Sequence, residues 1–234
     1  MSMLTHRLYA FLHTAVPFVL AGVVAGITTG CSTTPVSPAE PEKLVADART
    51  TLSNFLRDPD QTWIQQNLSR ARGVLISPEV VRAGFIFGGS GGRAVLLSRD
   101  GRIWAGPAFY DLATASVGFQ AGIDVSEVVI VVMTEKGLNS LLSPSFKIGG
   151  DASIAAGPVG ASAASTVTAD LIAFTRAKGV YGGLNLDGTI VNTNDAWNSA
   201  YYGRSVLPPD ILIRRAATNP NAAPLLSEVA NAAR

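Results

Sequence analysis

The feature of this sequence that most constrains its fold is a change of hydrophobic period at Gly73. Between residues 42 and 72 apolar side chains recur every three to four positions, as in helices, whereas later apolar runs are short and interrupted by glycine, as in strands. The runs expected to form strands are Val74–Ile76, Gly84–Phe87, Arg93–Ser98, Arg102–Trp104, Ala115–Gln120 and Val128–Thr134. We therefore predict an α+β fold: a compact single domain with a largely antiparallel, glycine-rich β-sheet or a partly closed barrel.

Two helices are expected before the strands. Glu42–Arg57 is amphipathic, and Asp58 and Pro59 supply a cap and a first helical residue for a second helix. Both apolar stripes are expected to pack on the core, and contact with a membrane or a ligand is the alternative. Later helices are expected at Glu135–Leu142, at Pro208–Ala217, at Ala222–Ala232, and from a cap at Asn194 to Gly203.

Three further patterns concern the strands. Asp100-Gly101 and Asp187-Gly188 each predict a two-residue hairpin turn. Val128–Met133 is apolar on both faces and predicts a central, buried strand. Ile148–Ala169 is rich in small side chains and predicts tightly packed β-structure.

The first thirty residues have the order of an export signal. Ala15–Ile27 form an apolar core, and Gly30 directly precedes Cys31. This ending is typical of a lipoprotein signal, although Thr28 stands where an aliphatic residue is usual. We expect removal of these residues and acylation of Cys31; the alternative is a transmembrane anchor over Leu8–Ile27, which has the roughly 20 residues that a bilayer requires.

A flexible tether is expected after the acylated cysteine. Ser32–Pro41 is rich in Pro, Ser and Thr, and at roughly 3.1 Å per extended residue it would span about 30 Å. The cysteine is followed by Ser32 instead of Asp, which favours the outer membrane of a Gram-negative envelope. We therefore expect a lipid-anchored protein of the cell outer membrane, facing the periplasm or the surface.

Composition restricts the chemistry of the mature domain. Both histidines, His6 and His13, lie in the predicted signal, and the single cysteine, Cys31, is blocked by lipid. Catalysis by Ser-His-Asp or Cys-His sets and metal sites with His or Cys ligands are therefore excluded. Without Arg7 the chain holds 17 basic and 17 acidic residues, so global charge favours neither nucleic acid nor an anionic membrane. We expect no catalytic residue, no metal and no cofactor.

Two local patterns resemble functional sites but have plainer interpretations. Gly88–Gly92 matches the Gly-x-Ser-x-Gly of hydrolases, but a strand follows it and no histidine could activate its serine. We predict a permissive hairpin there. Asp124 with Glu127, or Asp151 with Asp170, could pair as carboxylates or bind Ca²⁺, but their spacing resembles no metal loop. We expect them to be solvated surface charges.

Two local basic clusters remain as candidates for a binding site. Arg70 and Arg72 precede the first strand. Arg176 and Lys178 are two residues apart on a predicted strand, so they share a face and could bind one phosphate together. Solvation at the surface is the alternative for both clusters.

The order of several blocks resembles the SYLF domain, over roughly residues 43–217. The blocks are Ala71–Pro78, Gly84–Gly89, Trp104–Tyr110, Gly118–Gly122, Gly157–Gly160, Phe174–Gly183 and Tyr201–Gly203. The resemblance implies lipid binding, because eukaryotic members attach to phosphoinositide membranes through an amphipathic N-terminal helix and basic residues, and some bind and bundle actin. The corresponding segments here are Glu42–Arg57 and Phe174–Gly179, and the second keeps Arg176 and Lys178.

These observations predict a membrane-tethered, non-enzymatic module that binds phospholipid headgroups, of the phosphoinositide type or another anionic lipid. The candidate lipid-binding residues are Arg57, Arg70, Arg72, Arg176 and Lys178. A structural lipoprotein of the cell envelope that binds a protein partner is the alternative; neither nucleic acid nor actin is expected as a partner. The expected organisation is a signal peptide at 1–30, an acylated cysteine and tether at 31–42, a SYLF-like domain at 43–217 and a helical tail at 218–234.

Overall fold

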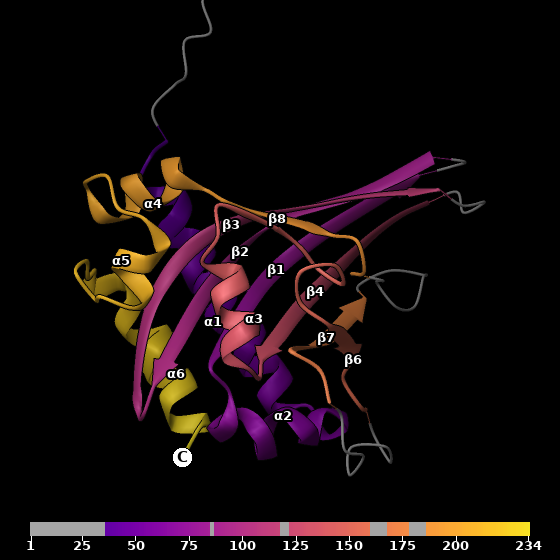
Figure 1. The fold of residues 1–234 in the computed structure, drawn as a ribbon, viewed down its shortest axis with the longest axis horizontal. Coiled ribbons are helices and arrows are strands. Elements are labelled where there is room, and N and C mark those ends of the chain that lie inside the picture. The colour runs from indigo at the N-terminus through magenta and orange to yellow at the C-terminus, as the bar shows by residue number, and fades with distance from the viewer. Residues whose placement is uncertain (1–35, 85–86, 118–121, 160–167, 178–185) are drawn as a thin grey trace, which may run out of the picture. The chain divides into compact units, whose positions relative to one another are not determined.

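An eight-stranded sheet forms the centre of the computed structural model, which describes residues 36–84, 87–117, 122–159, 168–177 and 186–234 (Figure 1). The strand order is β5-β8-β3-β2-β1-β4-β7-β6, and all neighbours are antiparallel except β6 and β7. The predicted α+β class with a largely antiparallel sheet is therefore confirmed. No helix within the described ranges is long and apolar enough to cross a membrane.

The four longest strands are neighbours in the sheet. The strands are β1 (Gly73–Gly84), β2 (Phe87–Asp100), β3 (Ile103–Val117), β4 (Gly122–Val132), β5 (Ser145–Lys147), β6 (Ile154–Ala156), β7 (Leu171–Ala177) and β8 (Ile190–Thr193). The helices are α1 (Ala39–Arg57), α2 (Thr62–Asn67), α3 (Glu135–Leu141), α4 (Asp195–Tyr202), α5 (Pro208–Leu212) and α6 (Ala223–Ala232), with 3₁₀ turns at Pro59–Gln61, Leu68–Arg70 and Pro220–Ala222. The short runs expected from the sequence are thus parts of longer strands.

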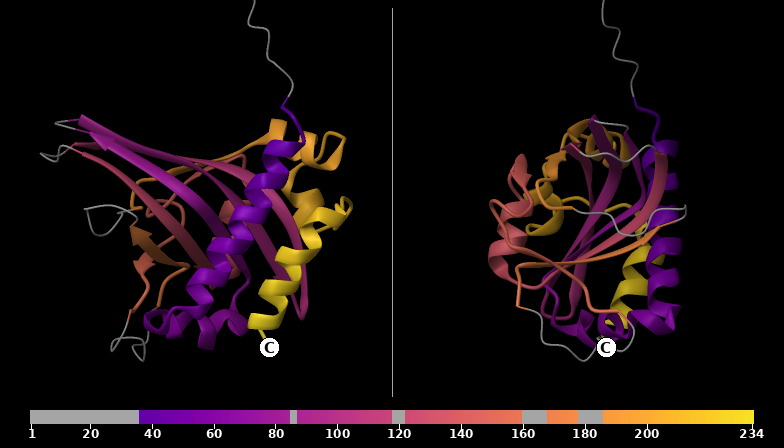
Figure 2. Two further views of the ribbon diagram at one scale, coloured as in Figure 1. Left: turned by 180° about the vertical axis from the view of Figure 1, so that it is seen from behind. Right: turned by 90° about the vertical axis from the view of Figure 1, so that its right-hand side faces the viewer.

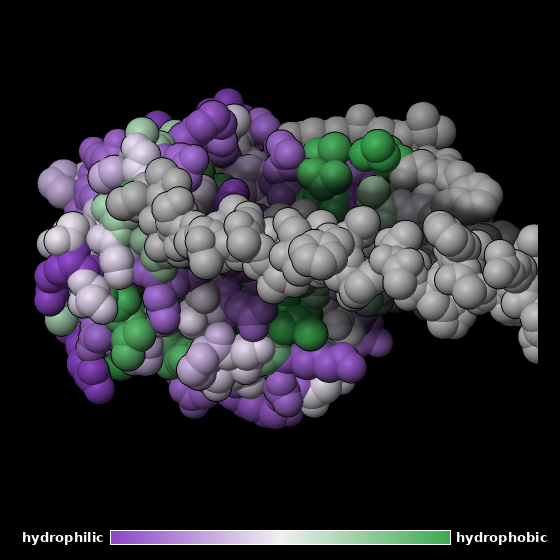
Figure 3. All heavy atoms as spheres, turned by 90° about the horizontal axis from the view of Figure 1, so that it is seen from above, coloured by the Kyte–Doolittle hydropathy of each residue, from purple (hydrophilic) through white to green (hydrophobic). Residues whose placement is uncertain are grey.

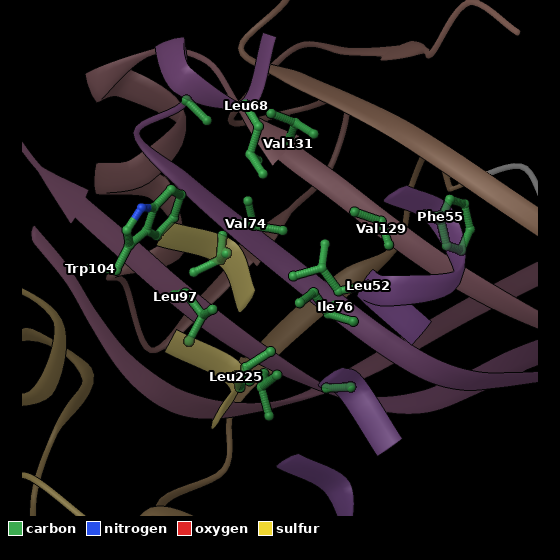
Figure 4. Close-up of a cluster of buried hydrophobic side chains, with 14 of the residues drawn as sticks. Leu52, Phe55, Leu68, Val74, Ile76, Leu97, Trp104, Val129, Val131 and Leu225 are labelled. Carbon is green, nitrogen blue, oxygen red and sulfur yellow. The ribbon is translucent and has the colours of Figure 1, made fainter. Parts of the chain in front are cut away.

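Helices cover both faces of the sheet (Figure 2). On one face, Leu52 of α1 and Leu225 of α6 pack with Val74 and Ile76 of β1 in a core that Figure 4 shows. On the other face, side chains of α3 and α5 pack with alternate residues of the same strands. Val128–Val132 is buried on both faces, which confirms the predicted central strand. Both cores lie within the compact unit Pro35–Arg234, so the core packing described here does not depend on residues 1–34.

Several predicted ends of elements are confirmed. The Asn194 side chain accepts a hydrogen bond from the Trp197 N–H at 3.0 Å, and α4 ends at Gly203 with φ 67°. The Asp58 carboxylate accepts from the Asp60 N–H at 2.9 Å. Gly101, with φ 60°, lies in the turn between β2 and β3. Gly188 also has a positive φ of 80°, although the strand expected before it lies outside the described residues.

Other elements differ from the prediction. α1 begins at Ala39, so the last residues of the expected tether are helical. α5 ends at Leu212 and not at Ala217, because the chain turns at Arg215, which has a φ of 55°. Of the expected β-structure at Ile148–Ala169, the described part contains strand β6 and an isolated bridge, while residues 160–167 lie outside it.

The prediction of a hairpin at Gly88–Gly92 is wrong, because this segment lies inside β2. It pairs with β1 on one side and with β3 on the other. The register between β1 and β2 shifts between Ile76 and Glu79, where the β1 backbone bulges. A Cβ at Gly92 would lie under 3.0 Å from the Glu79 carbonyl oxygen, so this glycine permits a close backbone approach within the sheet.

The two adjacent glycines Gly91 and Gly92 should respond differently to substitution by alanine, because only Gly92 lies against the bulge of β1. Gly92→Ala should lower the free energy of unfolding by about 1–3 kcal/mol, because the backbone of β1 has to move away. Gly91→Ala is the matched control: its Cβ would lie 3.5 Å from the Leu112 carbonyl oxygen, an ordinary contact, and stability should stay level or rise by up to about 1 kcal/mol. Urea unfolding of residues 32–234 measures both, and equal losses would contradict the bulge.

Candidate functional site

Arg176 lies opposite Glu127 in the register of β7 and β4 and forms an ion pair with it. The Arg176 Nε donates to Glu127 Oε2 at 2.8 Å, and Nη2 donates to the same oxygen. The Thr51 hydroxyl of α1 donates to Glu127 Oε1 at 3.1 Å, and the guanidinium carbon lies 5.2 Å from the ring centroid of Phe55. The charge of Arg176 is therefore balanced inside the domain, where it links α1 to the sheet. A ligand phosphate would have to compete with Glu127; Lys178 lies outside the described residues.

Two of the carboxylates expected at the surface are buried. Glu127 and Asp124 are 4% and 3% exposed, so the prediction of solvated charges is wrong for them. The reason is that helices and neighbouring strands cover β4, and its polar side chains must find partners there. One of the contacts of Asp124 is the Ser126 hydroxyl, which donates to its Oδ2 at 3.1 Å.

The other two carboxylates, Asp170 and Asp151, accept hydrogen bonds from nearby groups. Asp170 accepts hydrogen bonds from the Thr134 hydroxyl at 2.7 Å and from the Ser153 hydroxyl and N–H at 2.8 and 3.0 Å. These donors, that of Thr134 first, hold the pKa of Asp170 well below its usual range. The exposed Asp151 accepts from the Lys147 N–H at 2.7 Å. Within the described ranges, no group of three or more His, Cys, Asp or Glu residues could hold a metal ion.

The basic cluster at Arg70 and Arg72 is extended by residues from the β2–β3 hairpin. Arg70 is exposed at the end of a 3₁₀ turn, and Arg72 forms an ion pair with Glu135 at 3.2 Å. The Arg99 N–H donates to the Arg72 carbonyl at 2.8 Å, and its guanidinium donates to the Ser69 carbonyl. These bonds attach the segment around Arg70 to the end of β2.

A cavity of about 640 Å³ lies between this hairpin and the end of α6. The residues that line it are Arg99, Arg102, Trp104, Ala230, Ala233 and Arg234. The guanidinium carbon of Arg99 lies 5.9 Å from the ring centroid of Trp104. The Nε of Arg99 is buried and has no hydrogen-bond partner among the described residues. We call this site the arginine-lined cavity.

The chemistry of the arginine-lined cavity suits an anion with several oxygens. Three guanidinium groups line it, with no acidic side chain among its lining residues. A guanidinium presents a planar set of donors that matches a phosphate, and a buried donor without an acceptor costs roughly 1–3 kcal/mol until a ligand or water satisfies it. The larger groove of about 790 Å³ beside α1 is different, because five acidic and two basic side chains line it.

The sequence alone did not indicate most of this cavity. Arg99 and Arg102 flank the predicted turn, so the hairpin signal could have placed them together. Arg234 is distant in sequence, and no local pattern indicated that α6 ends beside the hairpin. Arg57 lies elsewhere: it is exposed at the end of α1 and lines a separate groove between α1 and α6, together with Glu42 and Glu228.

Removing Arg176 should destabilise the domain, because it takes the cationic partner away from the buried Glu127, which keeps the hydrogen bond from Thr51. We expect Arg176→Ala to lower the free energy of unfolding by about 3 kcal/mol, and addition of Glu127→Gln to restore part of it. The control is Arg72→Ala, whose ion pair with Glu135 is exposed and should contribute less than about 1 kcal/mol. Urea unfolding measures all three; equal losses for Arg176→Ala and Arg72→Ala would show that Glu127 does not depend on Arg176.

Known proteins similar to this chain were found in yeast and in mammals. "Protein YSC84" of Saccharomyces cerevisiae is 30% identical over 176 residues, which cover 71% of this chain and 37% of that protein. "LAS seventeen-binding protein 3" of the same species is 29% identical over 175 residues, with 71% and 38% covered. "SH3 domain-containing YSC84-like protein 1" of Homo sapiens is 26% identical over 161 residues, with 66% and 46% covered. The chain thus spans less than half the length of each of these relatives.

The family comparison agrees with these relatives. No solved structure matches the chain. The family profile of Ysc84, described as "Las17-binding protein actin regulator", matches residues 113–232, which is just over half of the chain. The chain therefore belongs to the Ysc84 family, whose domain is the SYLF domain that the sequence blocks indicated.

Proposed function

We propose that this protein is a membrane-tethered, non-enzymatic module that binds anionic phospholipid headgroups in the arginine-lined cavity. The observation that carries the proposal is the set of Arg99, Arg102 and Arg234 around one cavity without an acidic side chain. A lipid phosphate would supply the acceptor that the buried Nε of Arg99 lacks. Arg70 lies beside this end of the domain and adds positive charge at its surface.

The proposal includes an anchor at Cys31 in the outer membrane of a bacterial cell. Support for the anchor comes from the sequence, in which an apolar stretch ends directly before the single cysteine. Acyl chains of a lipoprotein hold a protein stably at a bilayer without help from a headgroup site. The headgroup site therefore has a role in recognition and not in keeping the protein at the membrane.

The family description adds a second type of partner for the relatives. It names Las17 binding and actin regulation, and this chain matches less than half the length of those relatives. For the present chain we propose the lipid and not actin, because the cavity is built from guanidinium groups and a bacterial envelope holds no actin. An envelope protein that carries phosphate-like charges would use the same chemistry, and the vesicle experiment below separates the two.

Vesicle flotation of residues 32–234 tests the headgroup site. We expect binding to vesicles that contain phosphatidylglycerol and weak binding to pure phosphatidylcholine vesicles, with a loss of affinity as salt is raised. Arg102→Glu with Arg234→Glu should weaken binding at least tenfold, because each cation near an anionic surface contributes about 1 kcal/mol and each reversal adds repulsion.

The matched control is Arg57→Glu with Lys147→Glu, which changes the net charge equally at two exposed positions outside the cavity. Its binding should stay within about twofold of the unmodified domain. Equal binding of the unmodified domain to both kinds of vesicle would reject a headgroup site. Equal losses in the two double variants would show that charge in general, and not this cavity, attracts the lipid.

A further inference from the structure

We propose that the arginine-lined cavity binds a bilayer other than the one that holds Cys31, so that the anchored protein bridges two membranes. This inference rests on the proposed function, both for the anchor and for the headgroup site. The geometry that points to it is the placement of the cavity at the end of the domain opposite to the start of α1. Three observations carry the proposal: the direction of α1 and α6, the length of the tether, and the side chains exposed around the hairpin.

The cavity and the start of α1 lie at opposite ends of the domain. α1 has 19 residues, which corresponds to a length of about 28 Å. α6 lies beside α1 and runs in the same direction, since Arg49 pairs with Glu228 at 3.6 Å and both helices end near the chain end marked C (Figures 1 and 2). The cavity residues Ala233 and Arg234 directly follow α6. Figure 3 views the other end, where α1 begins and where the described surface is mainly hydrophilic with separate hydrophobic patches.

The tether is short compared with this helix. Seven residues, 32–38, separate Cys31 from the first residue of α1. Fully extended they reach at most about 25 Å, and as a flexible chain they span about 15 Å on average. To turn the cavity toward its own bilayer, the start of α1 would have to stand a full helix length above that surface. The tether does not reach this far, so the domain cannot present the cavity end-on to the anchoring membrane.

Apolar side chains beside the cavity fit a bilayer surface. Ile103 of the hairpin is 57% exposed and Ile213 is 50% exposed. Both belong to the same end of the domain, because the Ser98 hydroxyl donates to the Leu212 carbonyl at 2.6 Å and Arg215 pairs with Asp100 at 3.0 Å. Neither isoleucine lines the cavity, which the arginines line between the hairpin and the end of α6. Apolar residues flanked by arginines can enter the headgroup region while the guanidinium groups bind lipid phosphates; a free phosphate ion would need only the arginines.

Clustering of vesicles tests the bridging. The full acylated chain is placed in phosphatidylcholine vesicles, and these are mixed with a second population that contains phosphatidylglycerol. Energy transfer between dyes in the two populations reports clustering. We expect clustering with the anionic population, at least a tenfold loss with Arg102→Glu and Arg234→Glu, and no loss with Arg57→Glu and Lys147→Glu. Ile103→Ser with Ile213→Ser should reduce clustering several-fold; no reduction would overturn the bilayer as the partner in favour of a phosphate contact alone.

A second measurement isolates the tether. In vesicles that all contain phosphatidylglycerol, an insertion of twenty Gly and Ser residues between Thr34 and Pro35 should reduce clustering, because the cavity can then reach its own membrane. Unchanged clustering would overturn the argument from tether length.

If residues 32–234 float with anionic vesicles but the anchored chain does not cluster them, bridging fails and the headgroup site stands. If residues 32–234 do not float, the proposed function fails. A purified chain whose mass lacks the acyl groups would overturn the anchor on which bridging depends.

Discussion

The central strands of the sheet are buried on both faces. Val128–Val132 has no exposed face, since α1 and α6 cover one side of the sheet and α3 and α5 cover the other. A charged residue in such a layer is stable only with a partner. Glu127 accordingly lies between Arg176 and Thr51, and this pairing joins α1 to two strands. Arg99 and Arg102, by contrast, lie where the strands leave the double cover.

The β2–β3 hairpin is such a place. Beyond the last buried residues of β2, Arg99 lies near the end of the strand and Arg102 lies in the turn, and the end of α6 lines the other side of the cavity. The sheet thus holds the hairpin rigidly, and α6 is held by its packing with α1. The packing of the hairpin and α6, and not the ligand, brings the three arginines to one cavity.

The sequence predicted those features that depend on local rules. The period of Val128–Met133, the cap at Asn194 and the turn at Asp100-Gly101 each depend on residues adjacent in the chain, and the structure confirms them. Gly88–Gly92 was misjudged because glycine marks both turns and close strand contacts, and only the bulge in β1 distinguishes the two.

The site was less predictable, because its residues are far apart in the sequence and no local rule connects them. Arg176 followed a family motif, but its partner Glu127 is 49 residues away, so the local sequence did not reveal that its charge is neutralised. Arg70 was selected from its sequence but does not line the cavity, whereas Trp104 and Arg234 come together only through the packing of the hairpin against α6. The family resemblance predicted the type of domain, and the three-dimensional structure was required to locate the cavity.

A nuclear magnetic resonance titration of ¹⁵N-labelled residues 32–234 with a short-chain, water-soluble phosphatidylglycerol would locate the lipid site. Binding in the arginine-lined cavity should shift the indole N–H signal of Trp104 and the guanidinium Nε–H signal of Arg99 before all others, with saturation at a common lipid concentration. Shifts that begin on the exposed side of α1 around Arg57, with Trp104 and Arg99 unchanged, would contradict the cavity as the lipid site.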